Sequence, residues 1–147
     1  MVTPPQIRKN SQWVIDNFGP QSGLERFGYD AESVAYLDAF IDRQGESFRA
    51  NQKSLDRIVS LLGAFVGEAI IATHGGEWHE NAHGISIVVK RGDTAHILQP
   101  FDKVRARVTA GPADSLLDYF SVLLPVVLSG PGPQRAEEPK KPWWKLF

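Results

Sequence analysis

The apolar residues of this sequence change their spacing twice along the chain. In the first half they recur three and four positions apart, which predicts helices over residues 4–19, 30–45 and 55–74. Pro4 suits the first turn of a helix, where its missing N–H costs nothing. Asp30 is placed to act as an N-cap, because its carboxylate can accept the free N–H groups of the first turn.

After the Gly75-Gly76 pair the pattern becomes β-branched and shorter in period. Three strands are predicted, over residues 77–79, 85–90 and 94–99. The Gly92-Asp93 pair is a signal for a two-residue hairpin, and residues 81–84 supply the other turn. The middle of the chain therefore predicts a three-stranded antiparallel meander.

The last part of the domain returns to helical spacing. Pro100 begins a helix that ends at the Gly-Pro pair of residues 111–112. Ser115 and Asp118 form an approximate capping box for a last helix, which Pro125 is predicted to kink or end. The order of helices, meander and two further helices predicts an α+β fold, with the helices packed on one face of the sheet.

Composition places the chain among globular proteins and removes several classes of function. A chain of 147 residues is the size of one domain, which we place at residues 1–128, followed by a Pro/Gly linker and tail at 129–147. The 16 basic and 17 acidic residues give a net charge of -1, which argues against nucleic acid as a partner. Because there is no cysteine, thiol nucleophiles and Cys-ligated metals are excluded, and no cofactor is predicted.

The pattern predicts neither a signal peptide nor a membrane span. The start of the chain is polar and Pro-rich, without the apolar stretch of a secretory signal. The longest apolar stretches, residues 61–72 and 116–128, are shorter than the ~20 residues that span a bilayer. We therefore expect a cytoplasmic protein.

Three of the four histidines lie close together, with acidic residues between them. The candidate metal ligands are His74, Glu77, His79 and His83. Imidazoles and carboxylates are the ligands that a metal takes when no cysteine is present. Alternation along a strand places Glu77 and His79 on one face, opposite Trp78. The spacing matches no zinc signature, so a polar loop with a solvated strand face is the competing interpretation.

Glu68 is the one charge within the apolar stretch of residues 61–72. A carboxylate in such surroundings needs a partner, or its pKa rises toward the range of a general acid or base. Glu68 is therefore a candidate catalytic residue. The alternative is a structural hydrogen bond or ion pair, for which Arg105, Arg107 and Lys103 are the expected partners.

Two glycines lie four residues apart in the third predicted helix. Gly63 and Gly67 leave one helix face without side chains, which permits close approach of another element. We interpret this face as a packing contact within the fold rather than a ligand groove. Trp78 is predicted to be a core anchor beneath the sheet.

The tail has the most unusual composition in the chain. Its last residues are Trp143, Trp144, Lys145, Leu146 and Phe147, preceded by two further lysines. Tryptophans flanked by lysines are typical of peptides that dock into a partner's groove and of segments at membrane surfaces. A third interpretation is that the tail packs on its own domain. We treat these five residues as the candidate partner-binding site.

Four segments, taken together and in order, resemble a family of small uncharacterised bacterial proteins that form a domain of unknown function. The segments are Gly-Ala-Phe-Val-Gly-Glu at 63–68, Gly-Gly-Glu-Trp at 75–78, Gln-Pro-Phe-Asp-Lys-Val at 99–104 and Asp-Ser-Leu-Leu-Asp-Tyr-Phe at 114–120. The resemblance covers roughly residues 55–122. It implies a shared fold but brings no established activity. By analogy, it suggests an accessory or immunity protein of a bacterial toxin system.

Taken together, the sequence favours a non-enzymatic cytoplasmic module that binds another protein. Two alternatives stay open. One is a metal-assisted hydrolase that uses the histidine cluster with Glu68 as acid or base. The other is a peripheral membrane protein attached through the basic-aromatic tail.

Overall fold

Three helices form the first half of the chain, as the periodicity predicted. In the computed structural model, which describes residues 3–82 and 84–129, they are α1 (Pro4–Ser22), α2 (Ala31–Arg49) and α3 (Gln52–His74). Each begins at a side chain that caps it. Thr3, Asp30 and Asn51 accept hydrogen bonds from backbone N–H groups in the first turns of α1, α2 and α3. The N-cap role of Asp30 is therefore confirmed.

The predicted ends of the first two helices were too early. α1 continues through Pro20 and ends at Gly23, whose φ of 79° is the left-handed conformation that closes a helix. Pro20 lies in the last turn, where its fixed φ fits the helix and only one backbone hydrogen bond is lost. α2 continues through Gly45, which is buried inside the helix, because an interior glycine costs only about 1 kcal/mol.

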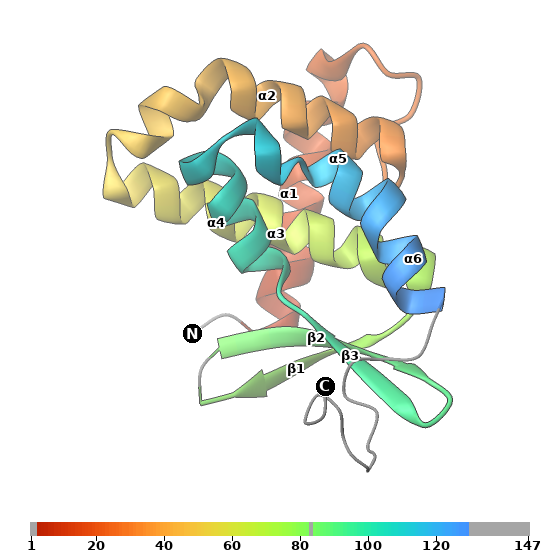
Figure 1. The fold of residues 1–147 in the computed structure, drawn as a ribbon. Coiled ribbons are helices and arrows are strands. Elements are labelled where there is room, and N and C mark those ends of the chain that lie inside the picture. Colours follow the sequence, from red (N-terminus) through yellow and green to blue (C-terminus); the bar gives the residue numbers. More distant parts are fainter. Residues whose placement is uncertain (1–2, 83, 130–147) are drawn as a thin grey trace.

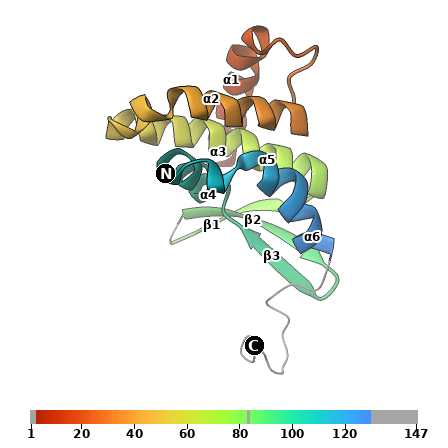
Figure 2. The same ribbon diagram turned by 45° about the horizontal axis from the view of Figure 1, so that its top comes forward.

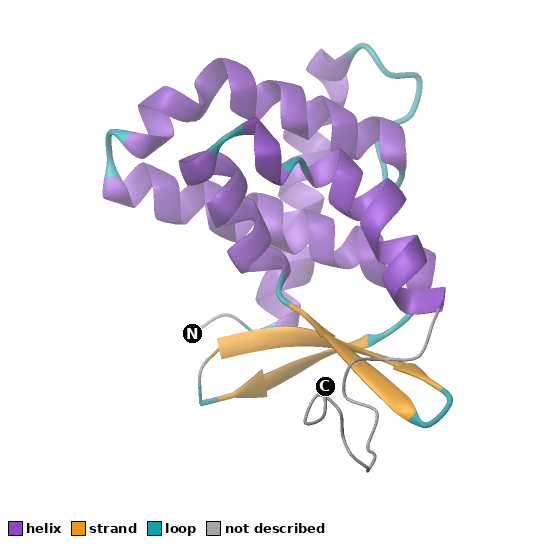
Figure 3. Cartoon of the chain, viewed as in Figure 1, coloured by secondary structure: helices purple, strands orange, loops and turns teal. Residues whose placement is uncertain are grey.

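The middle of the chain is the predicted antiparallel meander, drawn in orange in Figure 3. Its strands are β1 (Glu77–Asn81), β2 (Gly84–Arg91) and β3 (Thr94–Leu98), in the order β1-β2-β3. The register aligns Trp78, Ile87 and Leu98 in one row across the sheet. Because side chains alternate along each strand, this row shares one face of the sheet.

The chain ends in α4 (Pro100–Ala110) and an interrupted C-terminal helix. A 3-10 turn (Pro112–Asp114) leads into α5 (Leu116–Asp118), a wide π-helical turn (Tyr119–Leu123) and α6 (Leu124–Ser129). We call residues 116–129 the C-terminal helix. Pro125 does not end it. The wide turn comes directly before the proline and ends with a hydrogen bond from Leu124 N–H to the Tyr119 carbonyl.

All the described helices lie on one side of the sheet (Figures 1 and 2). α3 is the central helix and packs against α1, α2 and α4. Its buried residues, with Ile87 and Val89 of β2, form the centre of one continuous core. The fold is α+β, with three N-terminal helices, a three-stranded antiparallel sheet and two C-terminal helices, and the predicted fold class is confirmed.

Candidate functional site

Glu68 makes a structural hydrogen bond rather than an ion pair. The Trp78 indole N–H donates to its carboxylate at 2.8 Å, which joins α3 to β1. The partners expected from the sequence were wrong, because each of those cations pairs elsewhere: Arg105 with Asp56, Arg107 with Asp38 and Lys103 with Asp114. The contact supports the structural interpretation of Glu68, since its carboxylate satisfies an indole donor that would otherwise be partly buried without a partner.

The two glycines of α3 are close-packing positions, as predicted. A Cβ atom added to Gly67 would overlap the Trp78 ring, and one added to Gly63 would overlap the Phe101 ring. The two rings lie beside each other, with centroids 5.8 Å apart. Trp78 is partly buried against the core, so its role as an anchor beneath the sheet is confirmed.

The structure separates the candidate metal ligands. Glu77 and His79 share the outer face of the sheet, away from the helices, with Oε1 and Nε2 3.8 Å apart and both side chains more than half exposed. His74 lies at the end of α3 on the helix side, where its ring packs edge-on against Phe120 at 6.2 Å. Within residues 3–82 and 84–129, no three His, Asp or Glu side chains form a group able to hold a metal.

The joint site of Glu68 with the histidines is therefore not formed by the described residues. Glu68 binds Trp78, whose side chain points to the face of β1 opposite Glu77 and His79. His74 belongs to neither group. His83 lies outside the described residues, as do Trp143, Trp144, Lys145, Leu146 and Phe147, so their predicted roles stay predictions.

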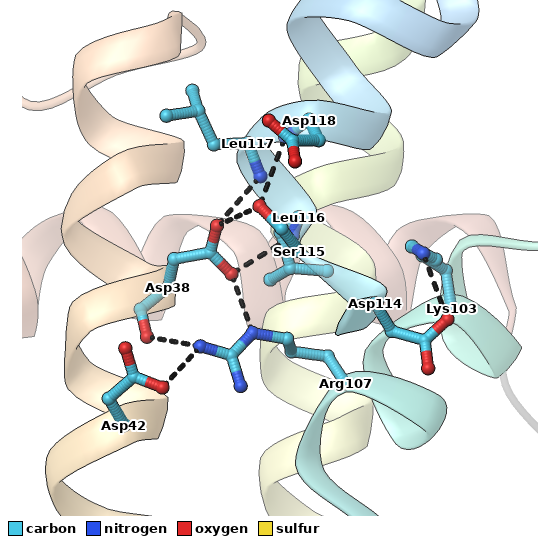
Figure 4. A network of polar contacts seen from close by, with 9 residues as sticks. All are labelled: Asp38, Asp42, Lys103, Arg107, Asp114, Ser115, Leu116, Leu117 and Asp118. Carbon is cyan, nitrogen blue, oxygen red and sulfur yellow. Dashed lines mark hydrogen bonds and ion pairs between the residues drawn. The ribbon is translucent and has the colours of Figure 1, made fainter. Parts of the chain in front are cut away.

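Asp38 of α2 holds the start of the C-terminal helix (Figure 4). Its carboxylate accepts hydrogen bonds from the backbone N–H groups of Leu116 and Leu117 at 2.9 and 2.8 Å and from the Ser115 hydroxyl at 2.8 Å. Ser115 accepts from the Asp118 N–H at 3.1 Å, so the serine half of the predicted capping box is present. A carboxylate from a distant helix thus caps the free N–H groups that a helix start leaves over.

Arg107 of α4 completes this cluster, which we call the Asp38 clamp. Its Nε donates to the Asp38 carboxylate at 2.8 Å, and its Nη2 donates to the Asp42 carboxylate at 2.7 Å and to the Asp38 carbonyl at 3.0 Å. The guanidinium is 3% exposed, and Asp42 is 56% exposed. The clamp ties α2, α4 and α5 together through a buried charge pair.

The electrostatics of the clamp favour a charged carboxylate. Burial acts to raise the pKa of Asp38, but hydrogen bonds from Leu117, Leu116, Ser115 and Arg107 together lower it below its usual value of 3.8. Each of the two carboxylate oxygens of Asp38 already accepts two hydrogen bonds. A carboxylate so fully engaged is a structural element, not an acid or base with a free valence for substrate.

A groove lies between α3, the start of β2 and α4. It encloses about 450 Å³, with apolar walls from Val59, Ile85 and Phe101. Its polar lining includes Ser60 and Arg105, and Arg105 is held by Asp56 at 3.0 Å. Because this cation is already paired, the groove offers a mixed polar and apolar surface rather than an arrangement of reactive groups.

The C-terminal helix exposes an apolar face. Val122, Leu123 and Val126 are 60%, 51% and 68% exposed, and we call these three residues the outer face of this helix. They are three of the five large exposed apolar side chains in the described residues, and the other two, Trp13 and Ile97, lie on different elements. The outer face is therefore a patch, whereas the other exposed apolar residues are scattered.

The wide turn explains why the two faces of this helix stay separate. The buried positions are Leu116, Phe120, Leu124 and Leu128. A spacing of four drifts about 40° per step around an α-helix, because a turn holds only about 3.6 residues. The π-helical turn holds more residues, which removes part of this drift and keeps the buried row against the core. Val122 and Val126 consequently stay on the solvent side.

The same region has the length and the apolar composition of a membrane-spanning helix. Pro112–Ser129 has a mean hydropathy of 1.2 over 18 residues, and 22% of this window is buried. By length and composition alone it is long and apolar enough to cross a membrane, which differs from the expectation that residues 116–128 are too short. Apolar helices of water-soluble proteins share this length and composition, so these two properties alone do not define a membrane span.

No family model, no curated protein and no solved structure matches the chain. The resemblance to the small bacterial proteins consequently stays a prediction that depends on the four segments quoted above. Function has to be argued from the surfaces and contacts of this chain itself.

Proposed function

We propose that the protein is a non-enzymatic interaction module that binds another protein through the outer face of its C-terminal helix. The observation that carries this proposal is the exposure of Val122, Leu123 and Val126, three large apolar side chains in one patch. Exposed apolar side chains that gather in one place are typical of binding surfaces, whereas single scattered ones are ordinary.

The spacing of the patch suits a partner that offers a groove. Val122 and Val126 are four residues apart and Leu123 and Val126 are three apart, so all three can enter one groove together. Burying the exposed part of each side chain contributes roughly 1 kcal/mol. Three such contacts at the centre of an interface supply a useful share of the binding free energy of a complex.

Two further observations support a binding role over catalysis. Glu68, the candidate acid or base, has its carboxylate occupied by the Trp78 indole. The Asp38 clamp is likewise fully engaged in bonds within the fold. The carboxylates of Glu68 and Asp38 therefore hold elements of the fold together.

The proposal extends to the sequence after the helix. The basic-aromatic tail at 140–147 follows the outer face in the chain, and its two tryptophans are residues of the kind that anchor interfaces. A role as an accessory or immunity protein of a bacterial toxin system fits a small module of this kind. The tail and this role are extensions of the proposal, supported by composition and resemblance.

The experiment compares two aspartate substitutions that add the same charge one residue apart. Val122→Asp removes an apolar contact from the outer face, whereas Ser121→Asp adds the charge at an exposed polar position of the same turn. Crosslinking in host cells, with quantitative mass spectrometry, measures the yield of each protein partner. We expect Val122→Asp to lower the yield of a specific partner roughly tenfold, because an unpaired charge would enter the interface.

Equal yields from Val122→Asp and Ser121→Asp would rule out the outer face as the contact. Flotation with vesicles of neutral and anionic lipids tests the membrane alternative. If the wild-type protein floats and Val122→Asp does not, the face binds a lipid surface and the protein-binding proposal is wrong.

A further inference from the structure

Two imidazoles, each with a buried Nε2 atom that has no hydrogen-bond partner, lie at the end of the molecule where α6 meets the sheet. His96 of β3 is 2% exposed, and His74 ends α3. The Nε2 atoms of both rings are buried and have no hydrogen-bond partner, and they are the two such side-chain atoms in the described residues. Buried polar atoms without partners are costly, so a pair of them at one end calls for an explanation.

Both histidines sit in the layer between the sheet and the helices. His96 lies opposite Val89 of β2 in the register, on the face that carries the core. The His74 ring packs edge-on against Phe120 of the wide turn, with centroids 6.2 Å apart. Figures 1 and 2 show α6 above the end of the sheet where β2 turns into β3. The C-terminal helix contacts this layer through Phe120, which packs on His74, and through α6, which packs on β2.

Arg91 is the charged group that acts on both rings. Its Nη2 donates to the His74 carbonyl at 2.8 Å, which fixes the guanidinium at this end of the sheet. Burial, and then the charge of Arg91, lower the pKa of both His74 and His96 below the usual 6.5. A proton added to either ring would meet a cation and find no acceptor at Nε2.

Within residues 3–82 and 84–129, no acidic side chain forms an ion pair with either ring. Between residues 119 and 129 the one ionisable side chain is Tyr119, whose ring lies beside the Lys103 ammonium at 5.3 Å. Lys90 and Asp93, at the end of β2 and in the following turn, are exposed. A metal cation is also disfavoured here, because Arg91 would repel it.

We propose that His96 and His74 form an acid-sensitive latch, which holds the C-terminal helix on the sheet when both rings are neutral and releases it when they are protonated. Release frees residues 119–129, the segment that carries the outer face. The consequence for partner binding rests on the proposed function, but the latch itself is a property of the fold and can be measured without a partner.

The direction of the effect follows from proton binding. Well above pH 6.5 both rings are neutral in the closed and the opened state, so pH has no effect on the latch there. Below 6.5 the opened state, with its solvated rings, takes up protons that the closed state resists. Opening therefore becomes more favourable as the pH falls, by at most roughly tenfold for each histidine and each pH unit.

The test is amide hydrogen exchange of the full-length chain at about pH 7.5 and about pH 5.5, corrected for the intrinsic pH dependence of exchange. We expect the opening constant for residues 119–129 to rise roughly tenfold or more at the lower pH, while amides in the middle of α3 change little. The double variant His74→Gln/His96→Gln, which cannot take up these protons, should lose this dependence. His79→Gln is the matched control, because His79 is exposed on the opposite face of the sheet.

A second measurement keeps the test informative if the double variant does not fold. NMR titration of the wild-type imidazoles should show His74 and His96 titrating below 6.5, with Phe120 and Leu124 resonances shifting together with them. Titration of either ring at or above 6.5, or an unchanged opening constant for residues 119–129, would overturn the latch. Either result would leave the partner-binding proposal standing, and loss of partner binding in Val122→Asp would not affect the latch.

Discussion

The two ends of the C-terminal helix are held to the same domain by different physical means. At its start, the Asp38 clamp satisfies the free backbone N–H groups with a carboxylate that also pairs with a buried arginine. At its far end, α6 is held by Leu124 and Leu128 above a layer that contains two unpartnered imidazoles. The first end is polar and fully satisfied, and the second is apolar with unsatisfied groups beneath it.

This difference shows how one helix can be both an anchor and a moving part. Segments that unfold locally make few buried contacts with the rest of the protein. Binding elements are often segments of this kind. The outer face begins on the wide turn and continues onto α6, so it lies toward the end that opens more easily. Because the Asp38 clamp holds α5 and weaker apolar packing holds α6, α6 could move while α5 stays in place.

The largest expected effect comes from breaking the clamp. Asp38→Ala leaves the Arg107 guanidinium buried and two backbone N–H groups without acceptors, so we expect the free energy of unfolding to fall by about 3–5 kcal/mol. Denaturant unfolding monitored by circular dichroism measures this change. Asp42→Ala is the matched control: it removes a carboxylate from the same arginine, but Asp42 is 56% exposed, and the loss should be about 1 kcal/mol or less.

Equal losses in these two variants would show that Asp38 acts only as a second surface partner of Arg107. Losses within about 0.5 kcal/mol of zero for both would remove the clamp as a source of stability. The informative quantity is the loss of unfolding free energy in Asp38→Ala relative to that in Asp42→Ala. Both aspartates lie on α2 and pair with Arg107, so they differ mainly in burial and in the backbone N–H groups that Asp38 caps.

A slightly smaller loss of unfolding free energy is expected when the apolar packing of α6 on the domain is weakened. Leu124 is 2% exposed, and its neighbour Leu123 is 51% exposed. Leu124→Ala should therefore cost about 2–5 kcal/mol through lost burial and the cavity left behind, whereas Leu123→Ala should change stability by about 0.5 kcal/mol or less. Thermal and denaturant unfolding of the two variants provide the measurement. A large loss from Leu123→Ala would mean that the outer face packs on the domain and is not free for a partner.

The fold could be predicted from the sequence because the signals for helices, strands and turns lie in short stretches of neighbouring residues. The change from helical spacing to short β-branched segments at Gly75-Gly76 marks the boundary between helices and sheet, and the structure places it there. The helix ends were harder to predict. Pro20 and Gly45 are both residues that can end a helix, and only their surroundings decide that they do not.

The contacts that hold the C-terminal helix could not be predicted in the same way. Asp38 is one polar residue in an amphipathic helix, and its partners Leu116 and Leu117 lie 78 and 79 residues away in the chain. Nothing local distinguishes it from a solvated aspartate. His96 did carry a signal, because alternation along the predicted strand of residues 94–99 places it on the same face as Leu98. The wide turn could not be foreseen from Pro125 alone.

Lowering the pH should destabilise the two ends of the C-terminal helix at different pH values. Asp38 has a lowered pKa, so the stability it provides is present above pH 3.8 and is lost as the pH falls below this value. The histidine latch weakens already below 6.5, because its rings have lowered pKa values and resist protonation only in the closed state. At about pH 5 we expect the Leu116 and Leu117 amides to remain protected while exchange at residues 126–129 has accelerated. Simultaneous loss of protection at both ends would contradict two separate devices.

The smallest effect is expected on the outer face of the sheet, which belongs to neither end and serves as a baseline. Glu77 and His79 form an exposed pair 3.8 Å apart, so Glu77→Gln should change the free energy of unfolding by about 0.5 kcal/mol or less. Because the described residues bring no third ligand to this pair, we also expect chelator or added Zn²⁺ to leave the melting temperature of untagged protein unchanged. A melting temperature that falls with chelator and recovers with Zn²⁺ would instead mean that His83 completes a site with this pair. The side of the sheet that carries Glu77 and His79 would then be a third anchored region, and the contrast between the two helix ends would no longer describe where the stability of the domain resides.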